Sequence, residues 1–250
     1  MKNIFERGLN LFDGVIYDPI IKHPTFSHIK SIFCDEWYNF IVPKVSPDKL
    51  NWSETSNVIK SQKEIGISMS YYIPDNLSQL YKDYFTKDNK HTSTSSDYYI
   101  CKHVDAKSTP IGQLFLVDDS SLKILIGMAK ICFPEWPNNE QYARHMYEHQ
   151  KSNSHKIVRN YLLKQDNNLV GFCGLIASQV DNLSYFHNMG VLPEFRRKGY
   201  FTAMVEHLIN ISIEYGISDT YGLVENGSGS YHGLTQLGYV VEDKYHLFST

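Results

Sequence analysis

The stretch from Leu183 to Ser212 constrains the fold of this chain more than any other. Leu183 to Val191 is apolar and aromatic, and Pro193 should end a strand there because proline cannot donate a hydrogen bond to a neighbouring strand. Past Gly199, apolar side chains recur at the spacing of a helix with one buried face, at Phe201, Met204, Val205, Leu208 and Ile209. The stretch therefore predicts a strand, a turn and a helix.

The predicted turn carries three consecutive cations, Arg196, Arg197 and Lys198, directly before Gly199. Free backbone N–H groups and the positive end of the helix dipole would point the same way at this helix start. The turn is therefore a candidate phosphate site, although a short basic run is also typical of a solvated turn.

Composition limits the class of protein. The chain has 250 residues, 42% of them hydrophobic and 14% aromatic, which indicates one large or two small packed domains. The formal charge of -3 gives no overall attraction to nucleic acid or to an anionic membrane. No signal peptide and no run of ~20 apolar residues is recognisable, so we expect no membrane association. The four isolated cysteines favour reduced thiols in a cytoplasmic protein over a zinc site or disulfides.

The first part of the chain gives weaker patterns. We expect irregular structure over 1–25 and a helix over 26–37, and the pattern of 51–63 is ambiguous. Alternation then predicts a strand over 65–72, and capping residues and an apolar stripe predict a helix over 76–86. The remaining elements expected here are a loop at 91–96, a strand at 98–104 and a linker at 107–110.

From Ile111 onward the pattern is clearer. It predicts strand, two helices, three strands, helix, strand, helix and a final strand region, with a tight turn at Asn167-Asn168. Phe133 to Pro137 forms a rigid aromatic loop between the first two helices.

Two motifs in this region resemble those of the GNAT acyl-CoA N-acyltransferases. The order strand, Val-x-Pro, basic turn, glycine and amphipathic helix is similar to the family's acetyl-CoA motif, with Arg196 and Gly199 at its first and glycine positions. Phe201 departs from it, standing where glycine or alanine is usual. Glu225-Asn226, Ser230 and Leu237-Gly238-Tyr239 resemble the second motif at the right separation.

The resemblance implies an α/β (α+β) GNAT fold, a mixed central sheet flanked by helices, over residues 109–250. Residues 1–108 are then either a degenerate GNAT-like half-copy, as in tandem GNAT proteins, or an unrelated α+β extension.

The resemblance also implies cofactor contacts. Backbone N–H groups at Met189, Gly190 or Val191 would polarise the thioester carbonyl. Asn226 and Ser230 would bind the pantetheine arm. The pyrophosphate of acetyl-CoA would lie on the loop made of Arg196, Arg197, Lys198, Gly199, Tyr200, Phe201 and Thr202.

The catalytic groups are less well defined. His187 and Glu225 are candidate bases, although strand alternation places His187 on one face with Met189 and Val191, where it could instead be packed. The family's usual tyrosine acid is replaced by Leu234, which leaves Tyr231 as an acid candidate only if the helix is displaced. The family places acceptor contacts in the loop containing Glu135, and we expect 132–138 and 178–184 to set specificity.

We therefore expect an N-acetyltransferase that moves acetyl from acetyl-CoA (coenzyme A) to a small-molecule amine, a peptide N-terminus or a lysine. Cys132 and Cys173 lack an activating partner in the sequence, which favours direct attack over an acyl-enzyme. The alternative is a non-catalytic acyl-CoA-binding module. We expect no nucleic-acid partner, no metal, and a monomer or homodimer.

Overall fold

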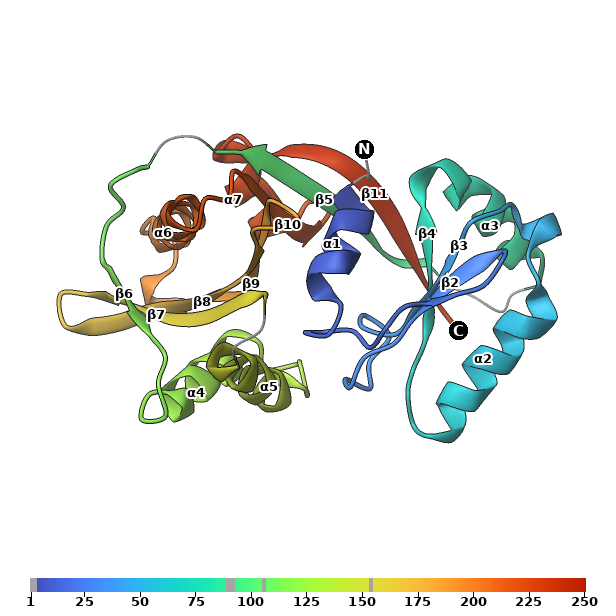
Figure 1. Cartoon of the computed structure of the whole chain (residues 1–250), viewed down its shortest axis with the longest axis horizontal. Coiled ribbons are helices and arrows are strands. Elements are labelled where there is room, and N and C mark those ends of the chain that lie inside the picture. The colour runs from blue at the N-terminus through green and yellow to red at the C-terminus, as the bar shows by residue number, and fades with distance from the viewer. Residues whose placement is uncertain (1–3, 89–92, 105–106, 153–154) are drawn as a thin grey trace.

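One continuous sheet organises the part of the chain that the computed structural model describes, residues 4–88, 93–104, 107–152 and 155–250 (Figure 1). Its eleven described strands lie in the order β1-β2-β3-β4-β11-β5-β10-β9-β8-β7-β6. The elements along the chain are α1 (Ile4–Phe12), β1 (Ile21–Lys22), β2 (Phe26–Ile29), β3 (Phe40–Pro43), the 3-10 turn η1 (Pro47–Lys49), α2 (Trp52–Glu64), β4 (Ser70–Pro74), α3 (Asp75–Asp88), β5 (Ser93–His103), β6 (Gln113–Leu116), α4 (Leu122–Cys132), α5 (Asn139–Lys151), β7 (Ile157–Gln165), β8 (Asn168–Ser178), β9 (Leu183–Val191), the 3-10 turn η2 (Pro193–Phe195), α6 (Tyr200–Glu214), β10 (Asp219–Glu225), α7 (Gly229–Gln236) and β11 (Val240–Ser249).

The element order predicted from Ile111 is confirmed, and so is the α/β fold class with a mixed sheet flanked by helices. The β7–β8 turn has Asp166 and Asn167 at φ of 47° and 68°, the left-handed conformation that Asp and Asn tolerate. Helix α6 buries Met204, Val205 and Leu208, which belong to its predicted stripe.

Several predictions for the first part of the chain are wrong. Residues 4–12 form helix α1, and the predicted helix at 26–37 is replaced by strand β2 and a loop. Phe26, Ile29 and Phe33 are all fully buried, so their helical spacing reflects a shared core and not a helix. The strand predicted at 65–72 begins only at Ser70, because α2 runs to Glu64 and Gly66 turns the chain at φ of 79°. Of the loop predicted at 91–96, residues 93–96 belong to β5 and 91–92 lie outside the described residues.

The two parts of the chain exchange strands. Strand β5 lies between β10 and β11 and is antiparallel to both, with Asp97–His103 opposite Asp219–Glu225. Strand β11 in turn lies between β5 and β4. The predicted division at 108/109 falls in the connection from β5 to β6, but the sheet is continuous across it.

The same succession of elements occurs twice. A strand, a 3-10 turn, a helix, a strand, a helix and a strand follow one another as β3-η1-α2-β4-α3-β5 and again as β9-η2-α6-β10-α7-β11. In both cases the first two strands are parallel, β3 with β4 and β9 with β10. This repetition in the described topology supports the tandem interpretation of the N-terminal half.

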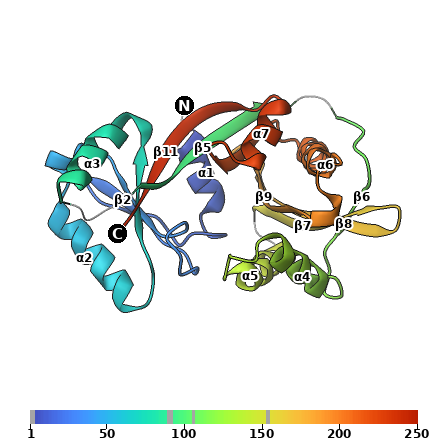
Figure 2. The same ribbon diagram turned by 180° about the vertical axis from the view of Figure 1, so that it is seen from behind.

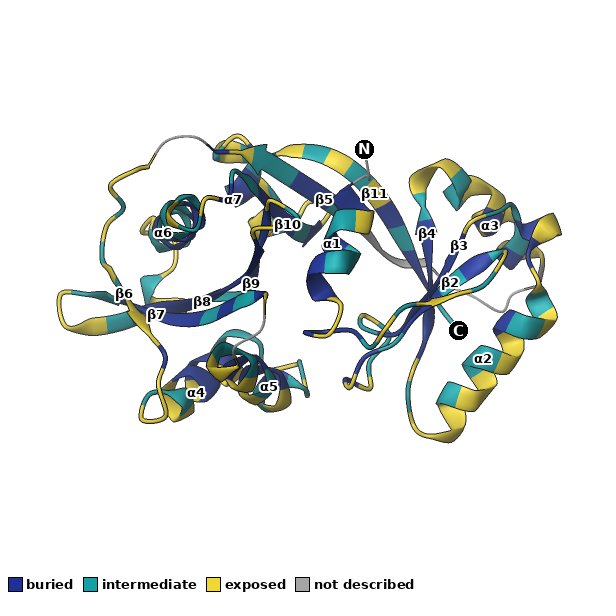
Figure 3. Ribbon diagram, viewed as in Figure 1, coloured by how far each residue is buried: buried dark blue, intermediate teal, exposed yellow. Residues whose placement is uncertain are grey.

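Helices cover both faces of the sheet (Figures 1 and 2). Helices α4 and α5 pack on one face of β7–β9 and α6 on the other, while α2 and α3 lie with the strands of the N-terminal half. Helix α1 packs between the halves, where buried residues of both form one core. At this seam between the halves, Phe5 of α1 stacks on Tyr245 of β11 with ring centroids 4.2 Å apart. Burial increases along β11, from an exposed start at Val240 to the buried Leu247 and Phe248 near its end (Figure 3).

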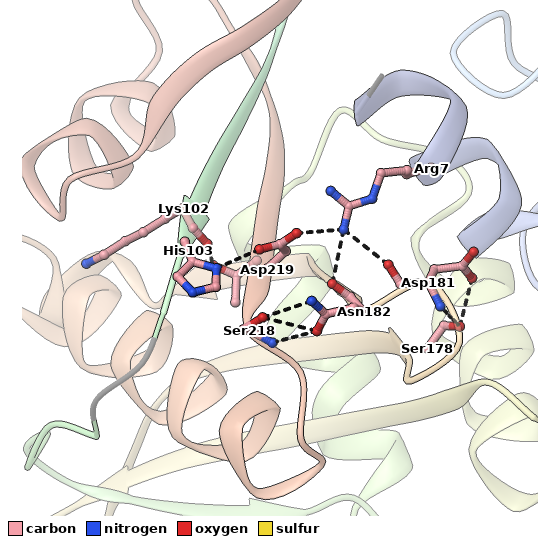
Figure 4. Close-up of polar contacts among 9 residues, drawn as sticks. Arg7, Lys102, His103, Ser178, Asp181, Asn182, Ser218 and Asp219 are labelled. Carbon is pink, nitrogen blue, oxygen red and sulfur yellow. Dashed lines mark hydrogen bonds and ion pairs between the residues drawn. The ribbon is translucent and has the colours of Figure 1, made fainter. Parts of the chain in front are cut away.

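Arg7 holds α1 against the C-terminal half (Figure 4). Its Nη2 donates to Asp219 Oδ2 at 2.7 Å and to the carbonyl oxygens of Asp181 and Asn182, both at 3.1 Å. His103 Nδ1 lies 2.9 Å from the other Asp219 oxygen. Burial raises the pKa of Asp219, but these hydrogen bonds from His103 and Arg7 outweigh it and the pKa is lowered overall. The network joins α1 to β10 and to the turn between β8 and β9. None of the helices in the described ranges is both long and apolar enough to cross a membrane.

Candidate active site

Strands β9 and β10 form a fork. They pair in parallel from Leu183 and Asp219 only as far as Tyr185 and Tyr221, yet β9 continues to Val191 and β10 to Glu225. Beyond the last pair, the facing edges therefore present backbone groups that are not paired with each other. Such edges can hydrogen-bond an extended, amide-containing ligand.

A β-bulge changes which face the side chains of β9 occupy beyond its last pair with β10. Asn188 has φ of 48°, and the register with β8 shifts between Phe172 and Gly174, so an extra residue lies in β9. The prediction that His187 shares one face of its strand with Met189 and Val191 is therefore wrong. Tyr185 packs in the core beneath α1 and α5, whereas Met189 and Val191 pack with α6 on the opposite face.

Gly190 follows the bulge, and only glycine fits there. A Cβ at this position would lie 2.5 Å from the ring of Phe172 and 3.0 Å from Cys132 Sγ. The backbone of β9 thus lies directly on the side chains of β8 and α4, which fixes the position of this segment.

The loop from η2 to α6 is open for an anion. Gly199 has φ of 82°, no atom lies within 4 Å of where its Cβ would be, and Arg197 also has a positive φ of 61°. In the described part of the chain, no group accepts a hydrogen bond from the backbone N–H groups of residues 197–202. These groups and the helix dipole favour negative charge at this point.

The three cations of the loop are oriented differently. Arg196 Nε donates to the Val191 carbonyl at 3.1 Å, and the guanidinium also contacts the Cys132 thiol. Lys198 Nζ donates to the Glu194 carbonyl at 3.1 Å and lies over the Phe195 ring. Arg197 is exposed. Arg196 therefore supports the turn, and Arg197 is available to a ligand in solution.

The corresponding turn of the N-terminal half is closed. Helix α2 follows η1 as α6 follows η2, but its N-cap Asn51 uses its side chain to accept from the N–H of Glu54 at 3.2 Å. Helix α6 begins at Gly199 without any side-chain cap. Of the two equivalent helix starts, only that of α6 combines basic residues with uncapped N–H groups.

A cavity of about 410 Å³ passes through the fork. From the α6 and α7 side it is lined by Phe201, Ser230 and Leu234, and in the fork by Asn188, Met189 and Gly222–Val224. On the other side it opens into a chamber of aromatic and apolar side chains, Phe12, Ile16, Tyr17, Trp37, Tyr38, Phe133, Trp136, Tyr142, Tyr185 and His187, while Phe186 lines it from the face that packs on α6. Both parts of the chain contribute to this chamber.

His187 lines the chamber but is 2% exposed. Burial lowers the pKa of its imidazole to about 3, against a smaller opposing effect of the Leu175 carbonyl. Its Nδ1 lies 3.2 Å from the hydroxyl oxygen of Tyr142. At neutral pH the ring is uncharged and a poor proton acceptor, which favours the packed alternative over the base.

The phenols around His187 are also uncharged at neutral pH. Burial is the main cause that raises the pKa values of Tyr17, Tyr38, Tyr142 and Tyr185 above the ordinary value of 10. The chamber is therefore electrically neutral on its surface and rich in aromatic faces.

The cavity lining does not include the candidate catalytic groups Glu225 and Tyr231, the acceptor-loop residue Glu135 or the predicted pantetheine contact Asn226. Glu225 and Asn226 are exposed at the end of β10, Glu135 is exposed in its loop, and Tyr231 packs its ring against Tyr98 and His232. Leu234, by contrast, does line it, with no proton to donate.

The departure at Phe201 has a structural counterpart. A Cβ on Gly233 of α7 would lie 2.7 Å from the Phe201 ring, so the absent side chain there makes room for the large one. Phe201 also lines the cavity, which it narrows from the α6 side.

Sequence reasoning missed the N-terminal contribution to this site. Phe12 reaches the chamber from the end of α1, Tyr17 from the segment between α1 and β1, and Trp37 and Tyr38 from the loop between β2 and β3. The high density of aromatic residues in these N-terminal segments was the available signal for a site. The positions of these side chains, however, depend on the exchange of strands between the halves and on the packing of α1. The segment 178–184, expected to set specificity, instead contacts Arg7.

Comparisons with known proteins agree with this geometry. Residues 122–239 match the model of the acetyltransferase (GNAT) family. A GCN5-related N-acetyltransferase from Kribbella flavida has a TM-score of 0.68 at 12% identity, with 98% of this chain and 93% of that chain covered. One from Sphaerobacter thermophilus has a TM-score of 0.65 at 12% identity, covering 98% and 84%. A tandem GNAT protein from the clavulanic acid biosynthesis pathway gives 0.57 at 9% identity, covering 92% and 81%. A comparison with curated proteins gave no match.

Proposed function

We propose, from the match of residues 122–239 to the acetyltransferase (GNAT) family model and from the geometry of the site, that the chain transfers acetyl from acetyl-CoA to a primary amine. The observation that carries the proposal is the alignment of an open basic helix start, an unpaired strand fork and an aromatic chamber. The first suits a pyrophosphate, the second a pantetheine arm and the third an acceptor.

In this proposal the backbone N–H groups of residues 197–202 bind the pyrophosphate with Arg197. Met189, Gly190 and Val191 present backbone groups to the thioester end, and Ser230 faces the arm from α7. Asn226, at the exposed end of β10, contacts the arm nearer to solvent. Residues 1–108 hold no acetyl-CoA, because their helix start is capped, and they instead form one wall of the acceptor chamber.

The reaction requires a neutral amine. Its nitrogen attacks the thioester carbonyl carbon, the C–S bond breaks, and coenzyme A leaves as its thiolate. A backbone N–H at the bulge of β9 stabilises the developing oxyanion. One proton leaves the ammonium before attack, and the second passes from the new amide nitrogen through water to the thiolate. Alignment of the two reactants supplies on the order of 7–11 kcal/mol of the barrier.

No acyl-enzyme is needed. Burial raises the pKa of the Cys132 thiol, although Arg196 opposes this, and burial raises that of Cys173 far above the ordinary value. Neither thiol is therefore an activated nucleophile at neutral pH. The free cysteines are also in keeping with a reducing, cytoplasmic location.

A non-catalytic acyl-CoA-binding module is the second candidate, and Leu234 favours it because this position has no proton donor. A thiol-release assay with acetyl-CoA and a mixture of primary amines separates the two. Amine-dependent thiol release, with acetylated amine identified by mass spectrometry, is expected. Binding of acetyl-CoA without any amine-dependent release would identify the binding module instead.

A further inference from the structure

The chamber beyond the fork also carries information on the acceptor. Among the described residues that line the cavity, none is Asp, Glu, Lys or Arg. The chamber is bounded by aromatic faces, by four phenols that stay protonated and by an imidazole that stays neutral at pH 7. A ligand that carries several charges would lose its hydration there without gaining a partner.

From this lining we propose that the acceptor is a small apolar monoamine, a primary amine on an aromatic or aliphatic group, and this rests on the proposed acetyl transfer. Aromatic faces bind such a group by apolar burial, and they tolerate one ammonium at their centre through cation–π attraction before it loses its proton. The chamber excludes polyamines, amino acids with a free carboxylate and basic peptides.

Two carboxylates lie near the chamber but outside its lining. Asp35 accepts hydrogen bonds from Asn138 Nδ2 at 2.8 Å and from Trp136 Nε1 at 3.3 Å, so it joins the loop of the N-terminal half to the loop before α5. Asp97 is 2% exposed and raises the pKa values of Tyr17 and Tyr185 by its charge. Both favour one positive charge within the chamber and disfavour an anionic ligand, without offering a second ammonium a direct contact.

The wall supplied by the N-terminal half fixes the width of the chamber. Tyr38 lies parallel to Trp136 with ring centroids 6.3 Å apart, and Trp136 contacts Tyr142 at 5.2 Å. Trp37 is 45% exposed and lines the same cavity, so it can be changed without opening the core. Trp37 is therefore the best position at which to test acceptor selectivity.

The test compares initial rates of thiol release for phenethylamine, benzylamine and hexylamine with those for spermidine, glucosamine, lysine and a lysine-containing peptide, using the full chain. The apolar monoamines should have the highest kcat/KM. Trp37→Ala should raise KM for them about tenfold with little change in kcat, because it removes binding that is equal in the ground and transition states. Phe115→Ala is the control, since Phe115 is also partly exposed, at 41%, but lies on the edge strand β6.

A second variant tests the role of charge. Trp37→Glu places a carboxylate in the lining and should shift selectivity from phenethylamine toward spermidine. A preference of the wild type for spermidine, glucosamine, lysine or the peptide would overturn the acceptor class while leaving acetyl transfer intact. Absence of turnover with every amine, in protein shown by calorimetry to bind acetyl-CoA, would overturn the proposed acetyl transfer and the acceptor class with it, in favour of the binding module. Absence of acetyl-CoA binding would overturn the proposed function with it.

Discussion

His187 shows how strongly burial can shift the pKa of a titratable side chain. The ordinary pKa of 6.5 falls to about 3 at His187, and burial lowers that of His28 to about 4. Both imidazoles bind a proton more readily in the unfolded chain than in the folded one. Their contribution to the free energy of unfolding is therefore complete above about pH 6.5 and is lost as the pH falls toward 3. His187 alone should remove on the order of 4 kcal/mol over that range.

Urea unfolding at pH 7.5, 5.5 and 4.5 tests this prediction. The unfolding free energy of the wild type should fall with pH more steeply than that of His187→Gln. His232→Gln, at an exposed position, should follow the wild type. Equal pH dependence in wild type and His187→Gln would show that the imidazole is not held neutral by burial.

The same neutral chamber predicts the pH dependence of turnover. His187 titrates near pH 3 and the lining tyrosines above pH 10, so no group of the lining changes charge near neutrality. We expect kcat/KM to rise about tenfold per pH unit until the pKa of the acceptor amine, and an amine of lower pKa should reach its plateau earlier. A plateau near pH 6 to 7 that does not depend on the amine would instead identify a base on the protein, with Glu225 the first residue to test.

The cysteines give a third prediction at this scale. Cys132→Ala should leave turnover within a few-fold of wild type, because its half-buried thiol, whose pKa is raised, is not needed in direct attack. Cys173→Ala should do the same apart from a loss of stability, since the side chain is 1% exposed. An acetylated cysteine that passes its acetyl group to an amine would contradict direct attack.

At the scale of elements, one close contact sets how near helix α1 lies to strand β10. A Cβ on Gly8 would lie 2.8 Å from the hydroxyl oxygen of Tyr221, a fully buried residue of β10. Gly8→Ala should therefore lower the unfolding free energy by about 1–3 kcal/mol through overpacking. Gly127→Ala in α4 is the matched control, because no atom lies near its Cβ and removing a helical glycine should stabilise by about 0.5–1 kcal/mol. Thermal melts of both variants check the prediction, and equal effects would show that α1 does not pack as described.

Elements whose apolar residues recur with a clear period could be predicted from the sequence. Elements whose structure depends on the segments they pack against could not. The strand, turn and helix of 183–212 are marked by an apolar and aromatic run, a proline stop and a helical stripe, all of which are local. The bulge at Asn188 has no local signal beyond an asparagine, and it changes which side chains face α6. The helix predicted over residues 26–37 is wrong because Phe26, Ile29 and Phe33 are buried in a strand and a loop that reproduce helical spacing, whereas Trp37 is 45% exposed.

At the scale of the whole molecule, the C-terminal domain is incomplete without the N-terminal half. Strand β5 fills the sheet between β10 and β11, and residues of both halves share the seam core. The fragment 109–250 expressed alone should therefore lack a cooperative thermal transition, whereas co-expression with 1–108 should restore it. A folded, acetyl-CoA-binding 109–250 fragment would show that the two halves are independent.

This dependence explains why the acceptor chamber could not be predicted. The loop proposed to bind the cofactor lies within one continuous stretch of sequence, so a motif describes it. The chamber combines α1, the loop after β2, the loop before α5 and strand β9. Only the exchange of β5 and β11 brings these segments together.

Calorimetric titration with acetyl-CoA of wild type, Gly199→Asp and Gly216→Asp tests the central claim most directly. The two glycines have φ of 82° and 72°, flank opposite ends of α6 and are both free of nearby atoms, so the same substitution imposes similar strain at each. We expect binding by the wild type and by Gly216→Asp, and at least about tenfold weaker binding by Gly199→Asp, whose carboxylate would repel the pyrophosphate. Equal affinity in both variants, or no binding by the wild type, would contradict the assignment of this loop as the acetyl-CoA site.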